Sequence, residues 1–236
     1  MVGALLASAV AATLTAAGWH SMWPTSQFYG PTFIGLERGS RLLALTYDDG
    51  PNKASTPQLL EVLAKNDVRA TFFMLGRHVT HQPDLAREVA AAGHAIGNHT
   101  YTHPNLIFAS PAQVSAQIEA CHRVLNDVVG EHSNLFRPPF GGRRPDVLAE
   151  VRRRGFVPVM WAISAYDWNR DSAEVIESRV SRRIRGGEVV LMHDGSDLGM
   201  GADRSASVAA TDRLIRRFKD QGYSFVTVPE MMRSDW

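Results

Sequence analysis

The sequence predicts an α/β fold of the irregular TIM-like (β/α)7 barrel type. From residue 41 onward, short β-rich runs alternate with helical patterns. The β-rich runs are almost continuously apolar, which is typical of parallel strands covered by helices. An open doubly wound sheet would give the same alternation. The barrel is favoured because polar residues follow many different strands, and such residues converge on one point only if the sheet curls.

Seven strands and six helices account for this pattern. The strands are expected at residues 42–47, 69–75, 94–98, 135–139, 156–163, 188–193 and 223–228. The helices are expected at residues 56–67, 82–93, 110–130, 144–155, 172–187 and 207–222. Several helical segments begin with Ser or Thr followed by Pro, and several end at Gly, as helix ends commonly do. The single cysteine, Cys121, falls on the apolar face of the third helix, so we expect a packed thiol and no intramolecular disulfide.

The chain divides into an N-terminal segment, residues 1–40, and one folded domain, residues 41–236. The segment opens with an uncharged, Ala-rich apolar run that is short for a membrane span and lacks the basic start of an export signal. Three interpretations stay open: a signal peptide or anchor whose start is cut short, a packed helix, or a segment lying on a membrane surface. Acidic and basic residues nearly cancel at a formal net charge of +1, so the composition does not demand a nucleic-acid partner.

Two adjacent aspartates, Asp48 and Asp49, end the first predicted strand. A turn needs only one such carboxylate, so the second requires a partner, most naturally a cation. His99 and His103 are four residues apart, and on a helical turn both imidazoles would point the same way. With one aspartate they make a two-histidine, one-carboxylate metal site with open positions. The other aspartate stays free beside the metal, where it can act as a general base.

Three further regions carry candidate chemistry. His193 closes the sixth strand and is either a satisfied core residue or, beside a metal site, a general acid with a pKa near neutrality. Asp167 could orient this imidazole, and Trp168 could exclude water from it. Arg137 is expected to hold Asp48 through a bidentate contact. The alternative for Arg137 is an ion pair that only ties layers of the barrel together.

These residues lie within five stretches, "TYDDGP", "HTYTHP", "RPPFGG", "YDW" and "LMH". Together and in this order they resemble the five motifs of the NodB-homology polysaccharide deacetylases, carbohydrate esterase family 4. The resemblance spans about residues 41–230. The metal ligands that it implies are Asp49, His99 and His103. The catalytic residues that it implies are Asp48 as base and His193 as acid, supported by Arg137 and Asp167. The substrate-binding residues that it implies are Phe140 through its backbone N–H, Trp168, and Leu191 in the acetyl pocket.

Three positions depart from the family pattern. Tyr47 replaces the usual Phe, and Phe140 stands where Tyr is common; both changes are mild, because these positions supply ring packing and a backbone donor. Ser164 occupies a position where many members carry an additional Asp. This position therefore cannot supply the second negative charge that many members place near the catalytic acid.

The resemblance implies metal-dependent hydrolysis of N-acetyl groups from polysaccharides or oligosaccharides that contain N-acetylglucosamine. The expected cofactor is one divalent ion, zinc by default and cobalt as the alternative. The expected partner is the N-acetylated glycan, and the protein is expected to bind it as a monomer. The expected location is the cell envelope or outside the cell, with a cytoplasmic location as the alternative. Membrane association through the N-terminal segment stays open in this picture. Other functions that stay open are removal of a formyl group from a lipid-linked sugar, opening of a cyclic amide, and sugar binding without catalysis.

The glycine-rich loop at residues 195–207 is expected to be mobile and to border the substrate groove.

Overall fold

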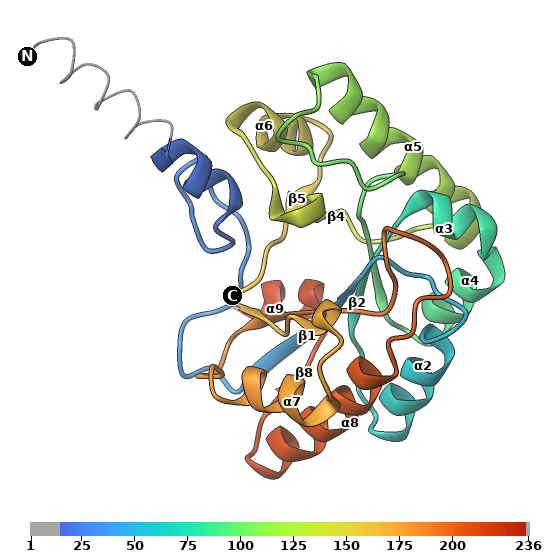
Figure 1. Cartoon of the computed structure of the whole chain (residues 1–236), viewed down its shortest axis with the longest axis vertical. Helices are drawn as coiled ribbons and strands as arrows, with labels where there is room; N and C mark the ends of the chain where they lie inside the picture. The colour runs from blue at the N-terminus through green and yellow to red at the C-terminus, as the bar shows by residue number, and fades with distance from the viewer. Residues whose placement is uncertain (1–14, 235–236) are drawn as a thin grey trace, which may run out of the picture.

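Parallel strands form the interior of the molecule and helices cover them on the outside (Figure 1). The computed structural model describes residues 15–234. The described strands are β1 (Leu42–Asp48), β2 (Thr71–Met74), β3 (Ala95–Asn98), β4 (Leu135–Phe136), β5 (Val157–Pro158), β6 (Ile163–Ser164), β7 (Val189–His193) and β8 (Ser224–Phe225). They pair in the order β5-β4-β3-β2-β1-β7-β6, with β8 joined to the start of β1. β1 pairs with β2 on one side and with β7 on the other, so a strand from late in the chain returns beside the first strand, as in the predicted irregular (β/α)7 barrel, and the fold class is confirmed.

All six predicted helices are present, and within residues 41–234 the structure contains two short helices that were not predicted. The predicted helices are α2 (Thr56–Lys65), α4 (Pro83–Ala91), α5 (Pro111–Val129), α6 (Pro145–Arg153), α7 (Ala173–Ser181) and α8 (Ser205–Asp220). The missed helices are α3 (Gly76–His81) and α9 (Val228–Arg233), and two 3-10 turns are found at η1 (Pro139–Gly141) and η2 (Asp167–Asn169). A helix of six residues is too short to show a hydrophobic period, so the sequence carries little signal for α3 and α9.

The single strand predicted at residues 156–163 is wrong, because the chain forms two short strands there. β5 and β6 do not pair with each other, and the barrel is interrupted between them. The lead-in segment, residues 33–36, lies across this interruption. Phe33 N donates to Pro158 O at 2.9 Å and Met160 N donates to Phe33 O at 2.7 Å. On the other side Leu36 N donates to Gly187 O at 2.7 Å, so the lead-in hydrogen-bonds to both flanks of the open edge.

Alternation along β1 directs its side chains to opposite faces of the sheet. Leu43, Leu45 and Tyr47 pack outward against the covering helices, whereas Ala44 faces the barrel interior. Asp48 stands an even number of residues from Ala44 and therefore shares its inward face. Cys121 of α5 is fully buried in the outer cluster, as predicted.

The lead-in also packs on the domain through Arg143. Its Nη2 donates to Trp23 O at 2.6 Å and to Ser26 O at 2.9 Å. Of the apolar N-terminal run, residues 1–14 fall outside the described residues, and the chain is helical over residues 15–22. Within residues 15–234, no helix is both long enough and apolar enough to cross a membrane.

The contact between the lead-in and the barrel can be tested at Gly35. This residue has a φ of 135°, and a Cβ added to it would lie 2.2 Å from Gly187 O. We expect Gly35→Ala to lower the free energy of unfolding by ~1–3 kcal/mol or more, because the added Cβ strains the backbone of residue 35 and clashes with the main chain of Gly187. Urea unfolding monitored by tryptophan fluorescence measures this loss.

Gly39→Ala is the matched control for this substitution. Gly39 lies in the same segment with a φ of 96°, but an added Cβ would meet no atom within 4 Å. This variant carries only the backbone cost, so its urea midpoint should lie between those of the wild type and Gly35→Ala. Equal midpoints for the two variants would contradict the role given to residues 33–36.

Candidate metal centre and active-site cleft

A cleft of about 1000 Å³ opens where β1 and β7 end. Nine of the ten predicted site residues line it: Asp48, Asp49, His99, His103, Phe140, Asp167, Trp168, Leu191 and His193. The tenth, Arg137, lies beneath the cleft floor and is fully buried. The carboxyl ends of parallel strands are the usual position for sites in this kind of fold. Residues separated by up to 145 positions are therefore brought to one cavity.

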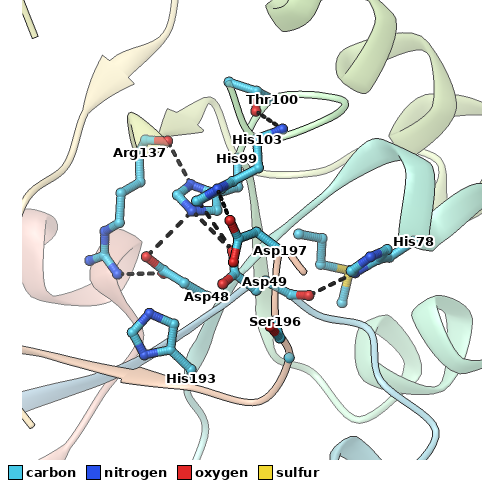
Figure 2. Close-up of polar contacts among 12 residues, drawn as sticks. Asp48, Asp49, His78, His99, Thr100, His103, Arg137, His193, Ser196 and Asp197 are labelled. Atoms are coloured by element: carbon cyan, nitrogen blue, oxygen red, sulfur yellow. Dashed lines mark hydrogen bonds and ion pairs between the residues drawn. The ribbon is translucent and has the colours of Figure 1, made fainter. Parts of the chain in front are cut away.

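Asp49 faces the two predicted histidine ligands (Figure 2). Its Oδ1 lies 3.5 Å from His99 Nε2 and 3.4 Å from His103 Nε2. Asp48 ends β1 and Asp49 follows it with a left-handed backbone, φ 71°, which breaks the alternation of the strand. The two neighbouring aspartates can therefore serve different partners.

His99 and His103 lie in an irregular loop after β3, and the predicted helical turn is wrong. Thr100 and His103 both adopt left-handed backbone conformations, with φ of 71° and 65°. His99 Nδ1 donates to Arg137 O at 2.7 Å, which leaves the lone pair of Nε2 directed toward Asp49. Burial lowers the pKa of each imidazole to about 3, so both rings are neutral at physiological pH. A neutral imidazole is the form that binds a metal.

The residues present fit a divalent cation. The ligand atoms of Asp49, His99 and His103 all lie within 4.8 Å of one another. Asp49 Oδ1 is buried and has no hydrogen-bond partner among residues 15–234. Burial raises the pKa of Asp49 to about 7, so a cation bound at this carboxylate would favour its ionised form. A buried carboxylate oxygen without a donor is unfavourable unless a cation is bound, and this donor set is typical of zinc.

Arg137 follows β4 and holds Asp48 from below the cleft. Its Nη1 donates to Asp48 Oδ1 at 2.7 Å and to Thr46 Oγ1 at 2.8 Å. Its Nη2 donates to Met160 O at 3.1 Å instead, so the predicted bidentate contact is wrong. The guanidinium also lies 4.1 Å from the centre of the Phe73 ring. Arg137 thus holds Asp48 in place and also links β1 to residues 159–160. Both roles that the sequence analysis considered for Arg137, support of Asp48 and a link between layers of the barrel, are therefore present.

His193 is held by Asp167 on the opposite wall. His193 Nδ1 lies 2.8 Å from Asp167 Oδ1, and His193 N donates to Asp167 Oδ2 at 2.8 Å. Ser207 Oγ also donates to Asp167 Oδ2, at 2.8 Å. The second oxygen of Asp167 is therefore satisfied by Ser207, while Ser164 accepts only from Tyr166 N at 3.3 Å.

Charge determines the protonation of His193. Burial alone would lower its pKa, but the carboxylate of Asp167, with further contributions from Asp49 and Asp48, raises the pKa to about 9. For Asp48, burial raises the pKa above its usual range, against the opposing charges of Arg137 and His193. The cleft therefore contains a carboxylate suited to accept a proton and an imidazolium suited to donate one.

Two aromatic side chains form the exposed rim of the cleft. The Phe140 ring packs edge-on against His103 with centroids 4.5 Å apart, and Trp168 packs in the same way on His193 at 5.1 Å. Leu191 is almost fully buried at the cleft wall. The rim is apolar around a charged floor, as in many sites that bind small molecules.

Three residues that the sequence analysis did not single out support the site. His78 lies with its Nδ1 2.8 Å from Asp49 O, Asp197 Oδ2 lies 3.2 Å from His103 Nδ1, and Ser207 contacts Asp167. None of the three belongs to a spaced pattern. Asp197 and Ser207 belong to the loop at residues 195–207 that the sequence places beside the groove, but no pattern distinguishes them within it, and the position of His78 follows from tertiary contacts alone.

Comparison with known proteins places the chain among deacetylases. A family model described as polysaccharide deacetylase matches residues 36–159. A chitooligosaccharide deacetylase of Bradyrhizobium is 36% identical over 200 residues, which cover 82% of this chain and 91% of the relative. A crystal structure of a peptidoglycan N-acetylglucosamine deacetylase in complex with an N-oxidanyl-benzamide is 34% identical. It covers 85% of this chain and 91% of its own, with a TM-score of 0.80.

The fold is shared even by a protein described as inactive. A carbohydrate esterase family 4 pseudoenzyme from Bacillus anthracis is 29% identical, with a TM-score of 0.78. The match covers 85% of this chain and 68% of that protein. The fold alone is therefore weaker evidence for catalysis than the complete set of polar residues around the cleft.

The two neighbouring aspartates should differ in metal binding. Mutation of a residue that only hydrogen-bonds to a metal ligand typically reduces metal affinity by ~10–100-fold. Asp49 is itself a proposed ligand, so we expect Asp49→Asn to weaken Zn²⁺ binding by more than ~100-fold. Asp48→Asn should bind Zn²⁺ almost as the wild type does, because Asp48 is paired with Arg137. Titration of each metal-free protein against a chromogenic chelator measures both constants, with thermal melts to verify folding. Indistinguishable affinities for the two variants would overturn this division of roles.

Proposed function

This chain belongs to the polysaccharide deacetylase family, carbohydrate esterase family 4, and we propose that it hydrolyses N-acetyl groups on N-acetylglucosamine-containing glycans. The observation that carries the proposal is the separation of Asp48 from Asp49. One carboxylate is paired with a permanent cation, the other faces two neutral imidazoles, and a protonated His193 lies across the cleft. Metal-assisted hydrolysis of an amide uses a general base, a metal site and a general acid, and these three elements meet in one cleft here.

In the proposed reaction, water attacks the acetyl carbonyl carbon and the carbon–nitrogen bond breaks. Asp48 accepts the proton of the attacking water, and Arg137 holds its carboxylate in place. A divalent cation bound by Asp49, His99 and His103 would supply Lewis-acid polarisation of the carbonyl and of the water. The Phe140 N–H donates to the developing oxyanion, a contact typically worth ~3–4 kcal/mol. His193 donates its proton to the departing nitrogen, so acetate and a free amine are released.

Each rim residue has a role in substrate binding under this proposal. Trp168 covers His193 and limits the access of bulk water to the acid. Leu191 presents a small apolar surface to the acetyl methyl group, and Phe140 aligns His103 through its ring. Asp167 keeps His193 protonated and oriented. These roles are supported by the positions of the residues around one cleft.

The cofactor is proposed to be zinc, with cobalt as a substitute. Two imidazoles and one carboxylate, with positions left for water and substrate, are typical of catalytic zinc. One chain supplies all ten site residues, which supports a monomer as the functional unit.

The relatives support a proposal for the glycan and for the location. Their names identify peptidoglycan and chitooligosaccharides as substrates of those proteins. Both polymers carry N-acetylglucosamine, so we propose that unit as the common element recognised here. Such substrates support a location in the cell envelope or outside the cell. Residues 41–236 are then the deacetylase domain, and residues 1–40 are its lead-in. The apolar start of this lead-in is proposed to associate with a membrane.

Product analysis tests the reaction. Incubation of the Zn²⁺-loaded protein with chitooligosaccharides and with peptidoglycan fragments should release acetate and leave free amines, detected by mass spectrometry. Asp48→Asn should reduce the rate by ~10²–10⁴-fold, because it removes the general base. Release of formate or opening of a cyclic amide in place of deacetylation would indicate another reaction of this site. Binding of the glycan without any product would overturn the proposal.

The pH dependence reports the proposed acid. His193 must be protonated, and its raised pKa keeps the proton up to alkaline pH, so kcat/KM should fall only as pH rises through a value above the ordinary ~6.5 of histidine. A bound cation would offset the charges of Asp49 and Asp48 and so lower this limb. Asp167→Asn removes the nearest carboxylate and should lower the alkaline limb by about one to three pH units.

Ser207→Ala is the control for this experiment. It removes a neutral hydrogen bond to Asp167 but leaves the carboxylate beside His193. Its alkaline limb should therefore move much less than that of Asp167→Asn. An alkaline limb that stays in place in Asp167→Asn would show that Asp167 does not set the protonation of His193.

A further inference from the structure

We propose that Asp197 is a positioning residue that fixes the orientation and the proton of His103, so that His103 Nε2 faces the metal. The inference rests on the proposed metal site and adds a residue to it. Asp197 lies outside the five motif stretches, in the loop that follows β7.

The two ring nitrogens of His103 have different neighbours (Figure 2). Nε2 lies 3.4 Å from Asp49 Oδ1, on the side of the metal ligands. Nδ1 lies 3.2 Å from Asp197 Oδ2, on the opposite edge of the ring. A proton on Nδ1 directed at Asp197 leaves the lone pair on Nε2, which is the tautomer that a metal requires.

His103 needs such a partner more than His99 does. His99 Nδ1 is satisfied by a main-chain oxygen, Arg137 O at 2.7 Å. His103 Nδ1 is buried and has no hydrogen bond of regular geometry among residues 15–234, so the nearby Asp197 carboxylate is the acceptor available to it. Phe140 packs against the ring but offers it no acceptor. Without Asp197, the ring would be free to turn and its second nitrogen would stay unpaired.

The loop that carries Asp197 is hydrogen-bonded to the barrel at its base and near its tip. Asn52 Nδ2 donates to Asp194 O at 2.9 Å and to Ala202 O at 2.7 Å, so one buried side chain closes the loop at its base. Arg77 of α3 donates to Asp197 O near the tip. The adjacent Leu198 remains 93% exposed at the cleft. These hydrogen bonds support the main chain that presents the Asp197 carboxylate to His103.

Metal affinity tests the proposal without relying on turnover. Zn²⁺ dissociation constants of the full chain would be measured by chelator competition for wild type, Asp197→Ala and Asp197→Glu. We expect Asp197→Ala to bind Zn²⁺ ~10–100-fold more weakly. Asp197→Glu restores a carboxylate and should recover a large part of this loss. With Co²⁺ in place of Zn²⁺, the visible absorption band of Asp197→Ala should shift, because the band reports the geometry of the ligands.

Asp203→Ala is the matched control. Asp203 lines the same cleft from the same loop, but its carboxylate only accepts from Ser205 N at 2.8 Å. Its Zn²⁺ affinity should equal that of the wild type. Arg77→Ala provides a second route, since it releases the backbone of Asp197 and leaves every ligand in place; it should weaken Zn²⁺ binding less than Asp197→Ala does.

The outcomes separate this proposal from the proposed function. Equal Zn²⁺ affinity and equal Co²⁺ spectra for wild type and a folded Asp197→Ala would overturn the role of Asp197 and leave the deacetylase proposal intact. Weaker binding that Asp197→Glu does not recover would also overturn it. A wild-type chain that binds neither metal would overturn both proposals, since no ligand would then need positioning.

Discussion

The buried ion pair between Arg137 and Asp48 is the contact on which the rest of the site depends. Burying two charges costs several kcal/mol per ion, and removing one partner of such a pair typically costs ~3–5 kcal/mol. Arg137 offsets part of this cost with donors to Thr46 Oγ1 and Met160 O and with the face of the Phe73 ring. Its carbonyl oxygen also accepts from His99 Nδ1. One residue therefore positions the proposed base with its side chain and a metal ligand with its main chain.

Backbone strain is concentrated around the same cleft. Left-handed conformations are unfavourable for residues other than glycine and are kept where surrounding contacts impose them. In the described part of the chain, most non-glycine residues with positive φ are in or beside the cleft, namely Asp49, Thr100, His103, Phe140, Tyr166 and Arg170. Asp67, at the end of α2, is the exception. The strain thus belongs to the ligands and the rim, and the strands that support them are regular.

The sequence was most informative where a pattern repeats along the chain. Apolar strands, helices and the Asp-Asp and His-x-x-x-His pairs depend on local spacing, and the structure forms these elements and brings the two pairs together. Of the six predicted helices, only α5 has a side-chain N-cap hydrogen bond. The predictions failed where distant contacts decide the conformation. The strand predicted at residues 156–163 divides because residues 33–36 hydrogen-bond across the open edge, and the histidine loop is left-handed instead of helical. Arg137 divides its donors between Asp48 and Met160 O, which no local pattern could indicate.

Charge balance explains why two identical neighbours can have different roles. The buried carboxylates that line the cleft are Asp48, Asp49 and Asp167. Asp48 is neutralised by Arg137, and Asp167 is neutralised by a His193 whose raised pKa keeps it protonated. Asp49 faces two imidazoles that burial holds neutral, so it is the carboxylate of the three that lacks a cation. A divalent ion placed there would supply the missing charge without disturbing either pair. Asp48 and His193 would then remain free for proton transfer, because the ion would bind to the third carboxylate.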